Sequence, residues 1–180
     1  KNILVFLPVM TAQAFDALTL LNALLAFAAF SLVSSSGYVF NDLMDLRADR
    51  AHPRKSARPF AAGRVPIAHG TAMVPLLLLG GLILAAFSTW QAFWIIALYF
   101  VLTTVYSLYL KRRAIADICT LAGLYTLRII AGGLATGVEL SVWLLAFSMF
   151  FFFSLAAVKR QAELVDLNGR GIPTARRRGY

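Results

Sequence analysis

The sequence predicts an all-α protein that crosses a membrane several times. Of its 180 residues, 60% are hydrophobic and 14% are charged, whereas about 25% of the residues in an average soluble protein are charged. The apolar residues form continuous runs close to the roughly 20 residues that a helix needs to span a bilayer. A transmembrane β-barrel would alternate polar and apolar residues. The continuous runs therefore favour a single domain over residues 1–180, built as a bundle of transmembrane helices.

Six apolar runs follow one another along the chain. The first, Ile3–Phe15, is too short to span a membrane and contains Pro8, so we expect the tail of a helix that begins upstream. Pro75 should kink the third run, and Arg128 interrupts the fifth. The five runs that are long enough to span are Ala17–Phe40, Val65–Phe87, Trp90–Leu110, Ala114–Val138 and Leu140–Val158.

Basic residues concentrate in alternate connections between these runs. Six Lys or Arg residues lie in segment 41–64, three in 111–113 and six in 159–178. The remaining connections carry neither Lys nor Arg, and they are 11–16, 88–89 and 139–141. Because basic loops face the cytoplasm, we expect a multi-pass protein of a bacterial or archaeal plasma membrane with this face inside. The net charge of +9 then reflects topology and phosphate binding, and no nucleic-acid partner is expected.

Three aspartates are unusually close together on this basic face. Asp42, Asp45 and Asp49 lie within eight residues and directly follow Asn41. If the helix continues through Arg50, their spacing of three and seven residues places them on one side of it. Carboxylates on one stripe repel each other unless a cation lies among them. Mg²⁺ prefers such oxygen ligands and usually binds together with substrate phosphates, so the pattern predicts a Mg²⁺–diphosphate site.

The alternative is a solvated, salt-bridged segment without a metal. No Lys or Arg stands three or four residues from any of the three aspartates, which disfavours ion pairs along the helix. Pairs across a bend in the chain, such as Asp49 with Arg54, remain open. The bases downstream, including Lys55 and Arg58, would bind the remaining charge of a diphosphate.

These residues resemble the first aspartate-rich motif of the UbiA superfamily of membrane prenyltransferases. The matching residues are Asn41-Asp42-x-x-Asp45-x-x-x-Asp49, then Arg58-Pro59 and Gly63, and finally Tyr106-x-x-x-x-Lys111-Arg112, which is similar to a loop with a phosphate-binding lysine. The resemblance implies a bundle of nine transmembrane helices around a cavity open to the membrane. This chain would be an incomplete part of it, truncated at both ends. The resemblance also implies Mg²⁺-dependent transfer of a prenyl group from a prenyl diphosphate to an acceptor, with loss of diphosphate.

Two departures from the common pattern resemble the branch that contains decaprenyl-phosphate phosphoribosyltransferase. At the place of the family's second Asp-x-x-x-Asp motif, the chain reads Lys159-Arg160-Gln-Ala-Glu163-Leu-Val-Asp166. The stretch His52-Pro53-x-Lys55 is also uncommon in the family. That branch transfers phosphoribose from phosphoribosyl diphosphate to a polyprenyl phosphate. The transferred group is therefore either a prenyl group or phosphoribose.

The predicted site follows from these motifs. Asp42, Asp45 and Asp49 would hold Mg²⁺ and act with Lys111 as catalytic residues. Donor or acceptor contacts are predicted for Asn41, Lys55, Arg58, Tyr106, Arg128, Lys159, Arg160, Glu163 and Asp166. The expected partners are a polyprenyl lipid, a diphosphate-bearing donor and the bilayer.

Two alternatives remain at this point. Arg128 lies inside a predicted span, where it serves either as a phosphate or acceptor contact or as a structural interhelical pair. A transporter is the less favoured class of protein, because the acids cluster at one membrane face and not at the midplane.

Overall fold

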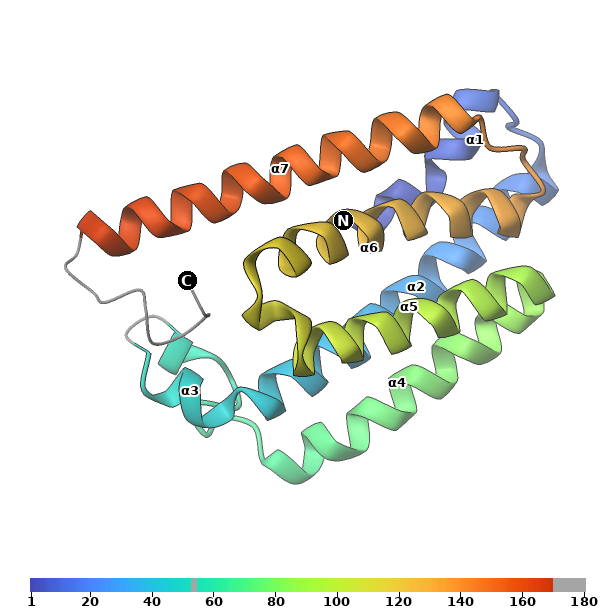
Figure 1. Ribbon diagram of the computed structural model, residues 1–180. Helices are drawn as coiled ribbons and strands as arrows, with labels where there is room; N and C mark the ends of the chain where they lie inside the picture. The colour runs from blue at the N-terminus through green and yellow to red at the C-terminus, as the bar shows by residue number, and fades with distance from the viewer. Residues whose placement is uncertain (53–54, 170–180) are drawn as a thin grey trace.

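The computed structural model describes residues 1–52 and 55–169, and this part of the chain consists of helices and their connections (Figure 1). It begins with two short turns, η1 (Asn2–Phe6) and α1 (Leu7–Ala12). The long helices are α2 (Ala17–Met44), α4 (Ile67–Ser88), α5 (Trp90–Leu108), α6 (Ala114–Thr136) and α7 (Val142–Gly169). The shorter connecting helices are α3 (Leu46–Arg50), η2 (Lys55–Ala57) and η3 (Leu110–Arg112). The predicted all-α class is confirmed.

The five long helices confirm the five predicted spans. Each is long and apolar enough to cross a membrane. Two of them continue past their predicted ends. Helix α2 passes Phe40 and so includes the start of the aspartate motif, and α7 passes Val158. The extension of α7 begins with Lys159-Arg-Gln-Ala-Glu-Leu, a run of residues with high helix propensity.

The short run predicted at Ile3–Phe15 forms η1 and α1 and is not a span. Pro8 stands in the first turn of α1, where its ring does not disturb the helix. Gln13 ends α1 in the left-handed region with φ of 53°. Asp16 then caps α2 by accepting a hydrogen bond from the Thr19 backbone N–H at 3.0 Å, and its hydrogen bonds with Thr19 lower the pKa of the Asp16 carboxyl. The turn η1 packs against α6 and α2.

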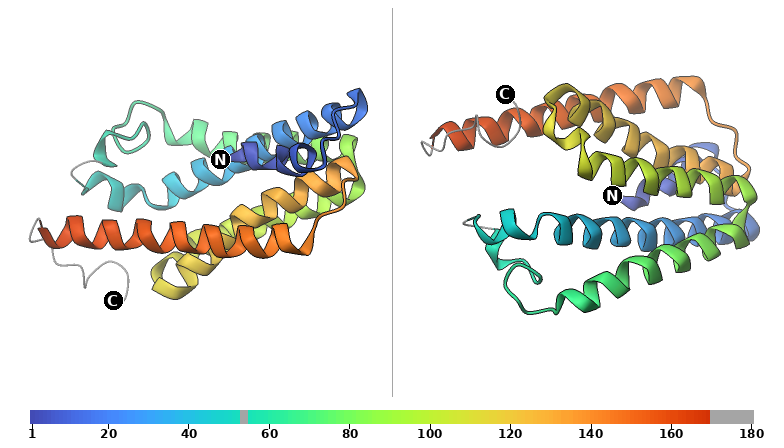
Figure 2. Two further views of the ribbon diagram at one scale, coloured as in Figure 1. Left: turned by 90° about the horizontal axis from the view of Figure 1, so that it is seen from above. Right: turned by 60° about the horizontal axis from the view of Figure 1, so that its bottom comes forward.

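The long helices form two groups that approach at one end and diverge at the other. Helices α2 and α4 make one group, and α5, α6 and α7 make the second (Figure 2). The connections at residues 89 and 137–141 lie where the groups approach. The diverging end carries α3, η2, η3 and the last turns of α7, and we call it the basic end. The predicted basic connections therefore share one end of the bundle, as far as the structure describes them.

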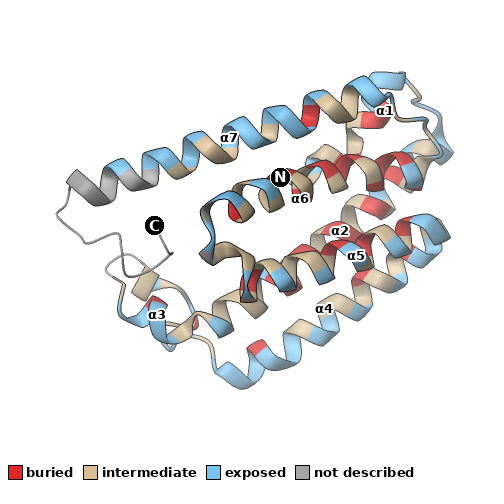
Figure 3. Cartoon of the chain, viewed as in Figure 1, coloured by how far each residue is buried: buried red, intermediate tan, exposed pale blue. Residues whose placement is uncertain are grey.

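The core lies mainly on α2, α5 and α6 (Figure 3). Its fully buried residues include Ala26, Ala29, Phe30, Val33, Ile96 and Ile129. Gly81 brings α4 close to α2, because a Cβ at this position would lie 2.6 Å from Val33 Cγ2 and 2.8 Å from the Ala29 carbonyl oxygen. Small residues of this kind allow close helix contact in lipid. The outer side of α7 instead exposes Trp143, Phe147 and Phe150, which suits a surface in an apolar environment.

Candidate functional site

The predicted aspartates lie at a break between two helices. Helix α2 ends at Met44, Asp45 has φ of −90° and ψ of 5°, and α3 begins at Leu46. The continuous helix expected through Arg50 is therefore interrupted at Asp45. The Asp45 N–H still donates to the Asn41 carbonyl at 2.9 Å, and the Asp49 N–H donates to the Asp45 carbonyl at 2.8 Å, so backbone hydrogen bonds are made on both sides of the break.

Arg58 joins the other two aspartates. Its Nη1 donates to Asp42 Oδ1 at 2.7 Å and to Asp49 Oδ2 at 2.8 Å. The Asp49 side chain is only 5% exposed, whereas that of Arg58 is 37% exposed. One cationic nitrogen therefore lies between two carboxylates that come from different helices, α2 and α3. Sequence spacing within one helix did not indicate this pair, because Arg58 reaches back from the connection to α4.

An apolar anchor places Arg58 at this position. Phe60 is buried and packs where α4 begins. A Cβ on Gly70 would lie 2.8 Å from the Phe60 ring and 3.0 Å from Leu43 of α2. Gly63, with φ of 72°, allows the chain to turn toward α4 in a conformation that side-chain-bearing residues avoid. The connection is thus fixed to both α2 and α4. Arg58 lies two residues before Phe60, so this contact also limits the position of the Arg58 backbone.

Lys111 brings the predicted Tyr/Lys loop to the aspartate motif. It lies in η3, between α5 and α6, and its Nζ contacts both carboxylate oxygens of Asp45 at 2.7 Å. The same Nζ donates to Asn41 Oδ1 at 3.1 Å. The fold therefore joins Lys111 to Asp45 and Asn41 across 66 and 70 positions of sequence.

A second cluster involves Tyr106 and Arg160. Tyr106 Oη donates to Asp117 Oδ1 at 2.7 Å, and Arg160 forms an ion pair with Asp117 Oδ2. The Asp117 side chain is 1% exposed, so this carboxylate connects α5, α6 and α7 inside the protein. Asp117 is not among the predicted site residues, although an acid that is buried in a helix bundle nearly always has partners. The substrate contacts predicted for Tyr106 and Arg160 stay predictions.

Arg128 lies far from the basic end, in the middle of α6. Its Nε donates to Asn2 Oδ1 at 3.1 Å, its Nη2 to Tyr99 Oη at 2.8 Å and its Nη1 to the Leu124 carbonyl at 2.6 Å. The rings of Tyr99, Tyr125 and Phe30 lie 4.9, 5.1 and 5.6 Å from its Cζ atom. Among residues 1–52 and 55–169, no carboxylate forms an ion pair with it. These contacts favour the structural alternative, and the predicted phosphate contact stays a prediction.

The remaining predicted residues lie at the basic end with fewer defined contacts. Lys55 is half-buried in η2, and its backbone N–H donates to His52 Nδ1 at 3.3 Å. Lys159 is exposed on α7. The side chains of Glu163 and Asp166 lie outside the described residues, so their predicted roles stay predictions.

Two of the three predicted metal ligands, Asp42 and Asp49, lie beside each other, and the predicted three-aspartate Mg²⁺ site stays a prediction. In the described part of the chain, no three His, Cys, Asp or Glu side chains gather in a cluster that could hold a metal ion. Asp45 pairs with Lys111. Asp42 and Asp49 both contact one positively charged nitrogen, which marks a position where positive charge is stable. Mg²⁺ is commonly held by one or two carboxylates together with substrate phosphates, and this pair has the required chemistry.

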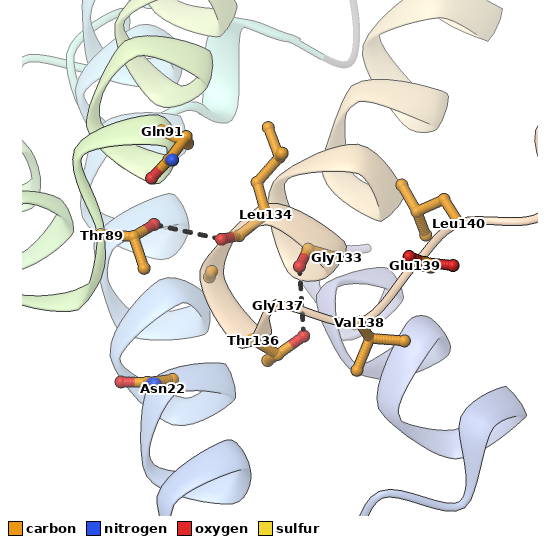
Figure 4. Close-up of a pocket in the computed structure, with 11 residues that line it drawn as sticks. Asn22, Thr89, Gln91, Gly133, Leu134, Thr136, Gly137, Val138, Glu139 and Leu140 are labelled. Atoms are coloured by element: carbon orange, nitrogen blue, oxygen red, sulfur yellow. Dashed lines mark hydrogen bonds between the residues drawn. The ribbon is translucent and has the colours of Figure 1, made fainter.

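A pocket at the opposite end of the bundle contains none of the predicted residues (Figure 4). It encloses about 650 Å³ and is lined by Thr89, Gln91 and residues 133–140, with Asn22 on α2. Thr89 Oγ1 donates to the Leu134 carbonyl at 3.2 Å beside it. Glu139 is the one acidic residue in its lining. The pocket lacks the combination of acids and bases found at the basic end.

Comparisons with known proteins show the family to which the chain belongs. The model of the UbiA prenyltransferase family matches residues 2–174. A decaprenyl-phosphate phosphoribosyltransferase of Mycolicibacterium smegmatis is 40% identical over 139 residues, which cover 77% of this chain and 44% of that protein. Nodulation protein NoeC of Azorhizobium caulinodans is 38% identical over 180 residues, covering 100% of this chain and 59% of that protein. This chain thus spans about half the length of the curated relatives it matches.

A solved structure shows the same fold. It belongs to a study of digeranylgeranylglyceryl phosphate synthase in membranes, and it superimposes with a TM-score of 0.73 at 22% sequence identity. The match covers 99% of this chain and 62% of the solved chain. At this identity, the likeness supports the helical arrangement alone.

Proposed function

The chain belongs to the UbiA prenyltransferase family, and from this premise we propose that it forms the diphosphate-binding part of a Mg²⁺-dependent membrane transferase. The observation that carries the proposal is the meeting of Asp42, Asp45 and Asp49 with Arg58 and Lys111 at the basic end. The five apolar spans make it an integral membrane protein. We further propose that the basic end faces the cytoplasm, because basic connections are retained on that side.

The two cations of the site suit a leaving diphosphate. Arg58 offers a planar guanidinium that can bind two phosphate oxygens at once, and Lys111 offers a compact ammonium. Asn41 holds the Lys111 ammonium at a fixed position beside Asp45. Asp42 and Asp49 would hold Mg²⁺, which supplies Lewis-acid stabilisation of the departing diphosphate when it is bound. The apolar faces of the long helices would accommodate an isoprenoid chain and limit access of water.

The first candidate donor is a prenyl diphosphate. It fits the name of the family and the apolar character of the helices. The reaction would transfer the prenyl group to an acceptor and release diphosphate, with Arg58 and Lys111 neutralising the leaving group.

The second candidate donor is phosphoribosyl diphosphate, with a polyprenyl phosphate as the acceptor. Relatives named decaprenyl-phosphate phosphoribosyltransferase are 35% to 40% identical to this chain. A relative named digeranylgeranylglyceryl phosphate synthase is 27% identical. A relative named protoheme IX farnesyltransferase 1 is 34% identical, so both donors stay candidates, and both would present their diphosphate to the same acids and bases.

A donor screen tests the proposal. The full-length protein is incubated with Mg²⁺, extracted lipids and either a prenyl diphosphate or phosphoribosyl diphosphate, and released diphosphate and modified lipids are measured by mass spectrometry. We expect release with one donor and a loss of about a hundredfold in Asp49→Asn. Asp16→Asn, at the opposite end, is the matched control and should retain activity. Solute flux without diphosphate release would instead indicate a transporter.

A further inference from the structure

We propose that Arg58 and Lys111 act as internal counter-ions that keep divalent metal out of the aspartate cluster until a diphosphate arrives, so that metal and donor bind as one unit. The aspartate cluster here means Asp42, Asp45 and Asp49. This inference rests on the proposed function of the same site and adds the order in which its ligands bind.

The first step of the argument is the position of the Arg58 guanidinium. Its Nη1 lies 2.7 Å from Asp42 Oδ1 and 2.8 Å from Asp49 Oδ2. A metal ion that bridged the same two oxygens would have to displace this nitrogen. Asp49 is nearly buried, and the separation of a charge from its buried partner leaves an uncompensated charge. Free metal therefore competes against an existing ion pair and not against water alone.

Lys111 pairs with the remaining aspartate, Asp45, in the same manner. Its Nζ contacts both carboxylate oxygens of Asp45 at 2.7 Å and also Asn41 Oδ1. The ammonium thus lies where a cation bound to Asp45 would lie. In this arrangement, each of the three aspartates has a basic partner from outside its own helix.

A diphosphate changes this competition between metal and bases for the carboxylates. Its oxygens replace the carboxylate partners that Arg58 and Lys111 would lose. Its oxygens give Arg58 and Lys111 charge-assisted hydrogen bonds equivalent to those they make with carboxylates. The released carboxylates are then free to hold the metal, and the metal is also bound by phosphate oxygens. Metal alone offers the displaced bases no new partner. By reciprocity, diphosphate should raise metal affinity by the same factor as metal raises diphosphate affinity, typically about 5- to 150-fold.

The structure allows Arg58 to make this exchange without unfolding of its connection. The Arg58 side chain is partly exposed, while Phe60 fixes the backbone against α2 and α4. A rotation of the side chain alone can therefore move the guanidinium from the carboxylates to a nearby phosphate.

Equilibrium dialysis of the full-length protein with Mn²⁺ as the metal probe and inorganic diphosphate as the second ligand tests the proposal. In the wild type, Mn²⁺ binding at fixed free Mn²⁺ should be weak without diphosphate and tighten by about tenfold or more with it. In Arg58→Gln, Mn²⁺ binding without diphosphate should tighten by about tenfold, and the gain from diphosphate should shrink. Arg47→Gln is the matched control, since it removes the same charge from a position of α3 outside the aspartate cluster.

The outcomes separate this proposal from the proposed function. If Mn²⁺ and diphosphate bind together but Arg58→Gln binds Mn²⁺ no better than the wild type, the counter-ion role is wrong. The proposed metal–diphosphate site would still be supported. Equal tightening in Arg47→Gln and Arg58→Gln would also overturn the counter-ion role, because a general charge effect would then suffice. If no Mn²⁺ binds even with diphosphate, both proposals fail. Lys111→Gln provides a second variant with the same expected direction should Arg58→Gln fold poorly.

Discussion

Two adjacent glycines on α4 give the sharpest test of the packing that supports the site. A Cβ at Gly81 would lie 2.6 Å from Val33 Cγ2 and 2.8 Å from the Ala29 carbonyl oxygen of α2. The valine methyl can shift, but the backbone oxygen belongs to a long helix and cannot. A Cβ at Gly80 would meet only Leu32 Cδ1, at an ordinary contact distance of 3.7 Å. Gly81→Ala should therefore push α4 away from α2, and Gly80→Ala should not.

The magnitude follows from two opposing effects. Overpacking of a close helix contact costs about 1–3 kcal/mol. Alanine in a helix gains about 0.5–1 kcal/mol over glycine. We therefore expect Gly81→Ala to lower the free energy of unfolding by about 1–2 kcal/mol. Gly80→Ala gains the helix stabilisation without the cost of overpacking, so its free energy of unfolding should equal or exceed that of the wild type.

The assay is thermal unfolding of both variants in the same detergent, followed by circular dichroism at 222 nm. For a protein of this size, 1 kcal/mol corresponds to roughly 2–4 °C, so the two variants should differ by several degrees. Equal stability of the two variants would refute the reasoning, because it would show that α2 and α4 can separate at no cost. Since α4 also anchors the connection that carries Arg58, the same displacement should weaken diphosphate binding in Gly81→Ala.

Three further predictions concern other contacts of α6. Asp117→Asn should lower the free energy of unfolding by about 3–5 kcal/mol, because it removes the buried carboxylate that pairs with the Arg160 guanidinium; a loss below about 1 kcal/mol in chemical denaturation would show that the pair is well solvated. Gly132→Ala should destabilise strongly, since its Cβ would collide with the Val5 carbonyl oxygen of η1, whereas Gly123→Ala, with no atom within 4 Å, should be tolerated; similar melting temperatures would contradict the η1–α6 contact. Arg128→Lys should melt below Arg128→Met, because lysine keeps the buried charge but loses the planar fork; the reverse order would show that retained charge matters more than geometry.

Sequence patterns predicted the spans well and the site in part. Continuous apolar runs specify helices directly, so all five spans could be placed from the order of residues alone. That Lys111 belongs to the same site as Asp45 was expected only through the family resemblance, and their direct contact was not predicted. It depends on how η3 lies between α5 and α6, which local patterns do not determine. The break at Asp45 was missed because the spacing of the three acids also fits one continuous helix.

The partners of the acids could not be found from helical spacing. Arg58 lies 16 residues after Asp42 and 9 after Asp49, well beyond the three- and four-residue neighbours that a helix brings together. Its position depends on the packing of Phe60 against Gly70, which is a tertiary contact. Asp117 was missed for the same reason, since its two partners come from α5 and α7.

The basic partners also reduce the repulsion between acids that the fold places close together. Two unpaired carboxylates about 4 Å apart would repel each other by about 4 kcal/mol at an effective dielectric constant of about 20, which is a large share of the stability of an ordinary domain. Arg58 removes this repulsion between Asp42 and Asp49, and Lys111 does the same for Asp45. The bases that would bind the diphosphate are thus the bases that stabilise these acids within the fold. The proposed weak binding of free metal follows from that arrangement, because the stability of the ion pairs and the affinity for a lone cation depend on the same two carboxylates.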